Sequence, residues 1–226
     1  MTSAPCRYPG CKDHDGNPRT TQDGMCITTH RNGQTSGCQT RFQQDITRLI
    51  LDWINLRKYM PTPLLREQAR RTTTREYGHP AEWASDTAAH IAGLLNDIHD
   101  NLAETLNATP PPHPGTTETV RIRAAWKFIE PRIQDLAHQE WAGDTATEIR
   151  QLHRQIRSRL GHSNPPETLP MPCPNNECGL LTLQRRIRPG TDLITCGNCG
   201  YTVKDDQDGS NYRWLVRVCL DTLIGT

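Results

Sequence analysis

Eight of the nine cysteines in this chain lie in two groups, one near each end of the sequence. The N-terminal group comprises Cys6, Cys11, Cys26 and Cys38, and the C-terminal group comprises Cys173, Cys178, Cys196 and Cys199. No cysteine occurs between the two groups. Four closely spaced thiols without a catalytic motif are typical of structural metal sites, and four thiolates suit the tetrahedral shell of zinc. We therefore expect two zinc ions per chain.

The composition favours folding that relies on metal more than on one large core. Of the 226 residues, 34% are hydrophobic and 5% are aromatic. A small apolar fraction limits the area that folding can bury, and metal-stapled modules need less of it. We expect a zinc-binding module at 1–38, a helical domain at 39–162, a proline-rich linker at 163–172, a zinc ribbon at 173–204 and a C-terminal helix at 205–226.

Between the cysteine groups, apolar residues recur at three- and four-residue steps, which predicts amphipathic helices. The expected helices span about 39–58, 80–107, 118–139, 145–160 and 210–223, with a shorter basic helix around 64–75. Pro131 should kink or split the third helix, because proline removes a backbone donor. Cys219 falls on the apolar face of the last helix and is expected to be a packed thiol. The predicted fold is mainly α, a helical bundle flanked by an N-terminal zinc knuckle and a C-terminal β-hairpin zinc ribbon.

The C-terminal cysteines have the spacing C-x4-C, then seventeen residues, then C-x2-C. Between the two pairs, the segments LLTLQRRI and DLIT indicate two strands of a hairpin. This pattern resembles the zinc-ribbon family, in which four thiolates close the metal shell and leave no position for water. A redox-active pair and an iron–sulfur cluster are the alternatives. The lack of a βαβ pattern around the Cys196–Cys199 pair argues against the redox reading.

The sequence does not decide which residue is the fourth ligand of the N-terminal site. Cys6 and Cys11 form one pair, and either Cys26 with Cys38 or Cys26 with His30 could complete the site. We prefer the all-cysteine set, because Cys38 follows Ser-Gly and begins the first long helix. A disordered tail with chance cysteines is the remaining reading.

Charge is distributed in stripes along a chain whose net charge is only +1. Phosphate contacts need clustered Lys and Arg, and the candidates are Arg66, Arg70, Arg71, Arg75, Arg185, Arg186 and Arg188. Tyr201 could stack on a base. The alternative for the hairpin arginines is a basic hairpin that docks on its own helical domain or on a partner. No Lys or Arg occurs from Glu76 to Val120, so the helix at 80–107 is a candidate acidic contact face. Two solvated helix faces of opposite sign, docked together, are the simpler explanation.

An enzyme is the weakest of the functional readings. Asp86, His90 and His99 could form an acid/base or metal site on one helix, although a charge pair with flanking polar residues is the commoner arrangement. His138, His153 and His162 are expected to be solvated. The sequence contains no serine elbow, P-loop, GxGxxG or HExxH motif. We therefore expect a non-enzymatic protein.

The sequence gives no reason to expect contact with a membrane. It has no apolar run long enough to span a bilayer, and its first residues lack the apolar segment of a signal peptide. We expect a cytoplasmic location, where a reducing environment favours metal binding by cysteine over disulfides.

The layout resembles the zinc-finger (zinc-ribbon) proteins of actinobacterial phages and prophages, which are commonly described as DNA-binding. In those proteins a cysteine knuckle leads into a helix of the form C-x2-R-x3-D-[IL]-x2-L, which here is Cys38, Arg41, Asp45, Ile46 and Leu49. They continue with helices and a ribbon that ends in CxxCG, here Cys196 to Gly200. The resemblance implies a phage or prophage protein that binds DNA or the transcription machinery.

This chain departs from those proteins after the ribbon. Members often carry a helix-turn-helix there, whereas the residues beyond Tyr201 suffice for one helix only. The rival expectation is therefore a protein-only adaptor or an inhibitor of a host system. In that case the acidic helix at 80–107 would be the contact face.

Overall fold

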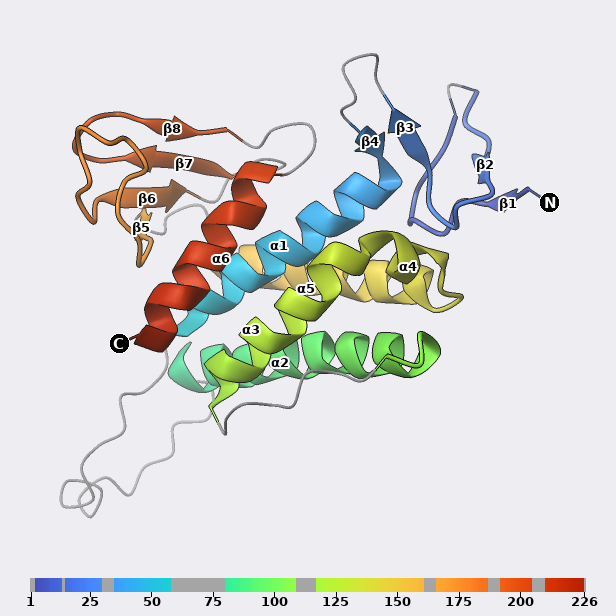
Figure 1. The fold of residues 1–226 in the computed structure, drawn as a ribbon, viewed down its shortest axis with the longest axis horizontal. Coiled ribbons are helices and arrows are strands. Elements are labelled where there is room, and N and C mark those ends of the chain that lie inside the picture. The colour runs from blue at the N-terminus through green and yellow to red at the C-terminus, as the bar shows by residue number, and fades with distance from the viewer. Residues whose placement is uncertain are drawn as a thin grey trace.

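The computed structural model describes residues 3–13, 15–29, 35–57, 80–108, 117–160, 166–186, 192–204 and 210–225. The described part is mainly helical, as predicted, with small antiparallel sheets (Figure 1). Its helices are α1 (Cys38–Leu56), α2 (Pro80–Thr105), α3 (Glu118–Ile129), α4 (Ile133–His138), α5 (Ala142–Leu160) and α6 (Ser210–Gly225). Five predicted helices are thereby confirmed, and the one expected around 64–75 lies outside the described residues.

Helix α1 forms the centre of the molecule. It contacts α2, α4, α5, α6 and the β3–β4 hairpin, so nearly its whole circumference is covered. Phe42, Ile46 and Leu49 are fully buried, and so is the polar Asp52 on the same helix. The buried residues of α1 belong to one hydrophobic core that also includes residues of α2, α3, α5 and α6, so the chain builds a single large core despite its lean composition.

Pro131 divides the third predicted helix. A 3-10 turn at Glu130–Arg132 separates α3 from α4. Proline offers no N–H to the helix and its ring clashes with the preceding turn, so the chain tightens and changes direction there. The short α4 then carries the chain toward the N-terminal cysteine module.

Three antiparallel sheets carry the two cysteine groups. Strands β1 (Ala4–Pro5) and β2 (Thr20–Thr21) pair, as do β3 (Ile27–Thr29) and β4 (Thr35–Gly37). The third sheet has the order β5 (Glu167–Thr168), β6 (Leu183–Arg186), β7 (Leu193–Cys196) and β8 (Thr202–Val203). In the predicted β6–β7 hairpin, Leu183 pairs with Cys196 and Arg186 with Leu193.

The two cysteine modules lie on opposite sides of the helices. Strands β1–β4 stand at one end of α1, and the sheet β5–β8 stands beside α6 (Figure 1). The segment expected to be a linker contributes β5 to the sheet, and its Leu169 and Met171 are buried. No helix in the described ranges is long and apolar enough to cross a membrane.

Candidate metal centres and contact surfaces

The N-terminal cysteines are brought together by the β3–β4 hairpin and the start of α1. Cys26 immediately precedes β3 and Cys38 begins α1, and the Cys38 backbone N–H donates to the Cys26 carbonyl at 2.8 Å. Gly37 makes this approach possible. Its φ is +120°, and a Cβ there would lie 2.5 Å from the Cys26 carbonyl oxygen.

The C-terminal cysteines occupy two loops at one end of the β6–β7 hairpin. The Cys173 N–H donates to the Leu180 carbonyl, and the Cys196 N–H donates to the Tyr201 carbonyl, each at 2.8 Å. These bonds fold both loops back on themselves and turn their sulfurs toward one another. The hairpin register then places the second loop against the first, where the Gly197 N–H donates to the Thr182 carbonyl at 2.8 Å.

The spacing of the sulfurs fits a tetrahedral metal site. Within each group the four Sγ atoms lie within 4.8 Å of one another. The separation is 3.7 Å for Cys11–Cys26, 3.7 Å for Cys173–Cys199 and 3.8 Å for Cys178–Cys196. A tetrahedron with metal–sulfur bonds of about 2.3 Å has edges of about 3.8 Å, whereas a disulfide bond measures about 2.05 Å. All nine cysteines are free thiols, and two groups of them could each hold a metal ion.

Burial and hydrogen bonding shift the pKa values of the clustered thiols in opposite directions. Burial, followed by the neighbouring thiols, raises the pKa of Cys26 to about 12. Burial likewise raises the pKa of Cys173 to about 12. Backbone N–H groups, with the Thr182 hydroxyl at 3.1 Å, lower the pKa of Cys196 to about 6. A bound dication reverses the penalty on the other thiolates and makes all four available as ligands.

Polar groups around the sulfurs stabilise negative charge on them. The Cys26 N–H donates to Cys6 Sγ at 3.3 Å, and the Asn198 N–H donates to Cys196 Sγ at 3.4 Å. The Asn198 side-chain amide donates to Cys178 Sγ at 3.4 Å. Donors of this kind orient metal ligands and tune their basicity.

The structure brings together the same two sets of four cysteines that the sequence predicts as metal ligands. Cys38 lies with Cys6, Cys11 and Cys26, as the all-cysteine prediction requires, and His30 lies outside the described residues. Cys219 is buried on α6 as predicted, apart from both groups.

Arg185 is buried, which removes it from the nucleic-acid candidates. Its side chain is 1% exposed and donates to Asp192 Oδ2 from Nε and Nη2, at 2.9 and 2.6 Å, and to Asp52 Oδ1 at 2.7 Å. Glu167 Oε2 lies 3.7 Å from Nη1. In β6 the side chains alternate between faces, so Arg185 follows Leu183 inward while Arg186 points outward. Arg185 therefore joins the hairpin to α1 and cannot reach a phosphate.

His153 is also buried, contrary to the expectation of a solvated side chain. Its Nδ1 lies 2.6 Å from Asp52 Oδ2 and its Nε2 lies 2.8 Å from the Asp45 carbonyl oxygen. Both ring nitrogens therefore lie within hydrogen-bond distance of an oxygen of α1. Burial alone would raise the pKa of Asp52, but Arg185, His153 and Arg157 outweigh it and hold that pKa below its ordinary value.

Five buried side chains and the partly buried Arg157 form one group that joins distant parts of the chain. We call this group, Asp52, His153, Arg157, Glu167, Arg185 and Asp192, the buried charge cluster. Arg157 on α5 donates to Asp192 Oδ1 at 2.9 Å, and the Tyr212 hydroxyl on α6 donates to the Asp192 carbonyl at 2.7 Å. On the N-terminal side, the Tyr8 hydroxyl donates to Asp45 Oδ2 at 2.7 Å. Both cysteine modules are therefore fixed to α1 by polar contacts. Local sequence patterns did not predict these contacts, because the partners Asp52 and Arg185 are 133 positions apart in the chain.

Of the remaining nucleic-acid candidates, the structure describes only Arg186. Arg66, Arg70, Arg71, Arg75 and Arg188 lie outside the described residues, and Arg186 is exposed. On α2 the acidic side chains Glu82, Asp86, Asp97 and Glu104 are exposed. That helix therefore presents an acidic face to solvent.

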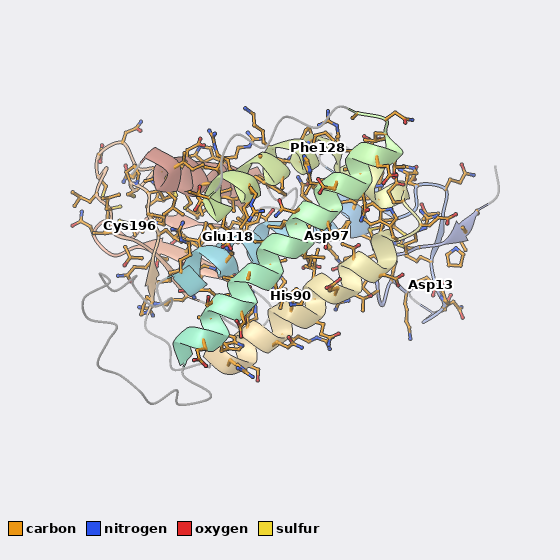
Figure 2. All side chains as sticks on the ribbon, turned by 90° about the horizontal axis from the view of Figure 1, so that it is seen from below. Asp13, His90, Asp97, Glu118, Phe128 and Cys196 are labelled. Atoms are coloured by element: carbon orange, nitrogen blue, oxygen red, sulfur yellow. The ribbon has the colours of Figure 1, made fainter. Side chains whose placement is uncertain are left out.

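Asp86, His90 and His99 do not converge on one site. Asp86 is exposed, and His90 is exposed where α2 runs beside α5, with Nε2 3.2 Å from Glu148 Oε1 (Figure 2). His99 is fully buried, and its ring packs edge-on against Phe128 with centroids 4.8 Å apart. Nine residues on a helix correspond to about two and a half turns, which places His99 on the face opposite His90.

Large exposed apolar side chains concentrate in the C-terminal module. Among the described residues they are Leu180, Leu181 and Tyr201 around the cysteine loops and Trp214 on α6. Leu181 is 63% exposed. Side chains of this size that stay in contact with water around a rigid module mark a candidate interaction surface.

Comparison of the chain with known proteins gives no match to a family model, to a curated protein or to a solved structure.

Proposed function

We propose that each cysteine group holds one zinc ion and that both ions are structural. The observation that carries this proposal is the sulfur spacing of 3.7–3.8 Å, which is the edge of a zinc–thiolate tetrahedron. Four thiolates fill the shell, so the metal has no position for water or substrate. In this proposal the β6–β7 hairpin with its two cysteine loops is a zinc ribbon, and the N-terminal module expected at 1–38 is a zinc knuckle.

Cobalt substitution tests this assignment. Tetrahedral cobalt(II) bound by four thiolates has intense visible absorption, so titration of metal-free protein should saturate at two equivalents. Cys38→Ser and Cys178→Ser should each remove one equivalent of this absorption. A spectrum that keeps both equivalents in either variant would exclude that cysteine as a ligand.

We propose further that the protein acts by binding, without catalysis, in the cytoplasm. Closed metal shells and the separation of Asp86, His90 and His99 support this reading. As a phage or prophage protein, it would bind DNA or the transcription machinery. The exposed Leu180, Leu181 and Tyr201 around the cysteine loops suit the apolar core of a protein contact. With Arg185 buried, the hairpin offers less positive charge to DNA, so we favour a protein of the transcription machinery.

Two binding measurements separate these partners. Purified bacterial RNA polymerase should bind the zinc-loaded protein, and Leu181→Ser with Tyr201→Ala should abolish binding while Trp214→Ala serves as a matched apolar control. Binding to duplex DNA would instead show a steep loss of affinity with salt. If neither RNA polymerase nor DNA binds at low salt, this proposal is wrong.

The second candidate function is that of a protein-only adaptor or inhibitor of a host system. The observation that favours it is the acidic face of α2, because Glu82, Asp86, Asp97 and Glu104 are exposed there. Its partner would carry a basic surface. Reversal of Asp86 and Asp97 to lysine should then abolish that contact and leave the fold unchanged.

A further inference from the structure

One cysteine of the C-terminal group differs from the other seven clustered cysteines in its exposure to solvent. Cys199 is exposed, whereas the others are buried or half-buried. It lies in the turn between β7 and β8, and the next residue, Gly200, faces open space. A small solute can therefore approach the C-terminal group from the side of Cys199.

Hydrogen bonds shield Cys199 less than its neighbour Cys196. Cys196 Sγ accepts from the Asn198 backbone N–H at 3.4 Å and lies 3.1 Å from the Thr182 hydroxyl. The Asn175 side-chain amide is farther from Cys199 Sγ, at 3.7 Å. Donors that stabilise a thiolate also lower its nucleophilicity, and metal binding keeps a thiol deprotonated. Cys199 therefore combines access to solvent with little hydrogen-bond stabilisation of its sulfur.

A second thiol is placed to form a disulfide with Cys199. Cys173 Sγ lies 3.7 Å from Cys199 Sγ, and Cys173 is only 4% exposed. A disulfide bond measures about 2.05 Å, so the two sulfurs need to approach by about 1.6 Å. The two residues belong to different cysteine loops, so a bond between them joins the loops that a shared metal would join. An exposed thiolate beside a second thiol is the arrangement of redox-sensing cysteines.

The N-terminal group has the same sulfur spacing without the same exposure. Cys11 Sγ and Cys26 Sγ are also 3.7 Å apart. None of the four cysteines in that group is exposed, and Cys26 and Cys38 are buried. Oxidation of a thiol depends on its access to solvent as well as on its thiolate character. The two groups of one chain should therefore differ in their reaction with a soluble oxidant.

We propose that Cys199 is a site of oxidative modification by peroxide and that Cys173 converts the product into a disulfide. The Cys199 thiolate attacks one oxygen of hydrogen peroxide, and the O–O bond breaks. The departing hydroxide takes up a proton to form water, and Cys199 becomes a sulfenic acid. The Cys173 thiolate then attacks this sulfur, the S–O bond breaks, and the hydroxide leaves with a proton as a second water. The two sulfurs supply the two electrons that the peroxide accepts.

This inference rests on the zinc assignment proposed above, because the disulfide removes two of the four thiolates of the C-terminal site. Loss of these ligands releases the ion, while the disulfide keeps the two loops together. The Cys173 and Cys196 N–H groups donate to the Leu180 and Tyr201 carbonyls, so these loops also carry the exposed apolar side chains. Oxidation therefore acts on the surface to which we assign the protein partner.

Treatment of the zinc-loaded full chain with hydrogen peroxide tests the proposal. A chromogenic chelator measures free zinc, and dimedone, which traps sulfenic acids, marks the modified cysteine for peptide mass analysis. We expect dimedone first on Cys199, release of one of the two zinc ions, and a Cys173–Cys199 disulfide when dimedone is left out. The N-terminal group is the internal control and should keep its ion. Dithiothreitol with added zinc should restore the full metal content.

A histidine substitution separates reactivity from metal binding. Cys199→His removes the exposed thiolate but keeps a ligand, because zinc also accepts three cysteines and one histidine. This variant should contain two zinc ions by elemental analysis and should keep both in peroxide. Cys11→His is the matched control in the N-terminal group, and peroxide should release its C-terminal ion as fast as that of the unmodified chain.

Three results would overturn the proposal. They are a first dimedone adduct on a cysteine other than Cys199, loss of zinc from both groups at the same rate, and equal release from Cys199→His and the unmodified chain. If Cys199→His does not hold two ions, the adduct map of the unmodified chain decides. A chain that holds no zinc refutes the zinc assignment as well, whereas equal loss from both groups refutes this inference alone.

Discussion

The buried charge cluster makes the strongest prediction about stability. Arg185→Met removes the cation that bonds to Asp52 and Asp192 at 2.6–2.9 Å and lies 3.7 Å from Glu167. Arg157 still donates to Asp192 and His153 still bonds to Asp52, so two of the three carboxylates keep a donor. Removing one partner of a buried ion pair costs about 3–5 kcal/mol. We therefore expect the variant to lose about 4 kcal/mol of unfolding free energy, a large part of the roughly 5–15 kcal/mol that stabilises a domain.

Urea unfolding at pH 7 with excess zinc and a reducing agent measures this loss. With a slope of about 2 kcal/mol per molar urea, the midpoint should fall by about 2 M. Arg186→Met is the matched control, because the neighbouring side chain has the same charge and is exposed. Its effect should stay below about 0.5 kcal/mol. Equal midpoints for the two variants would refute the account of the cluster.

Two further predictions concern single positions. Gly24 has a φ of +67° and a Cβ there would lie 2.1 Å from the Ala137 carbonyl, whereas Gly16, at φ +86°, faces open space. Gly24→Ala should therefore lose about 3 kcal/mol of unfolding free energy in thermal or urea unfolding, and Gly16→Ala should lose only about 1 kcal/mol. Equal losses in the two variants would contradict the close packing of the N-terminal module on α4. Burial, then the charge of Glu167, raises the pKa of Cys219 to about 12 from an ordinary value of 9.0. The unfolding free energy that this thiol contributes is fully present below pH 9 and is lost as the pH rises above 9. Above pH 9 the unmodified chain should therefore lose about 1 kcal/mol of unfolding free energy per pH unit more than Cys219→Ala. Parallel pH profiles of the two proteins would be inconsistent with the burial of Cys219.

The sequence was sufficient for features that depend on local periodicity and spacing. Apolar steps of three and four residues located five helices, and Pro131 marked the break between α3 and α4. Cysteine spacing identified both thiol groups, because ligands of one metal must return to the same point in space. Helical periodicity also predicted that Cys219 is buried, because it lies on the apolar stripe of α6.

Features that depend on distant partners were not predictable in this way. Arg185 was a candidate for phosphate contact, with docking of the basic hairpin on the helical domain as the alternative. Its place two residues after Leu183 in a strand puts both side chains on one face. His153 lies four residues after Ile149 and three before Ile156, which places it on the inward face of α5. It was nevertheless predicted to be solvated, because histidine is a polar residue. In both cases burial depends on Asp52, which belongs to another element, and a local pattern contains no information about such a partner.

The central claim is that two closed zinc–thiolate sites hold the ends of this chain on its helical core. Elemental analysis of the purified, reduced protein tests it most directly. We predict two zinc ions per chain, with one remaining in Cys38→Ser and one in Cys178→Ser. A stoichiometry of one or none in the unmodified chain, or iron in place of zinc, would contradict the account.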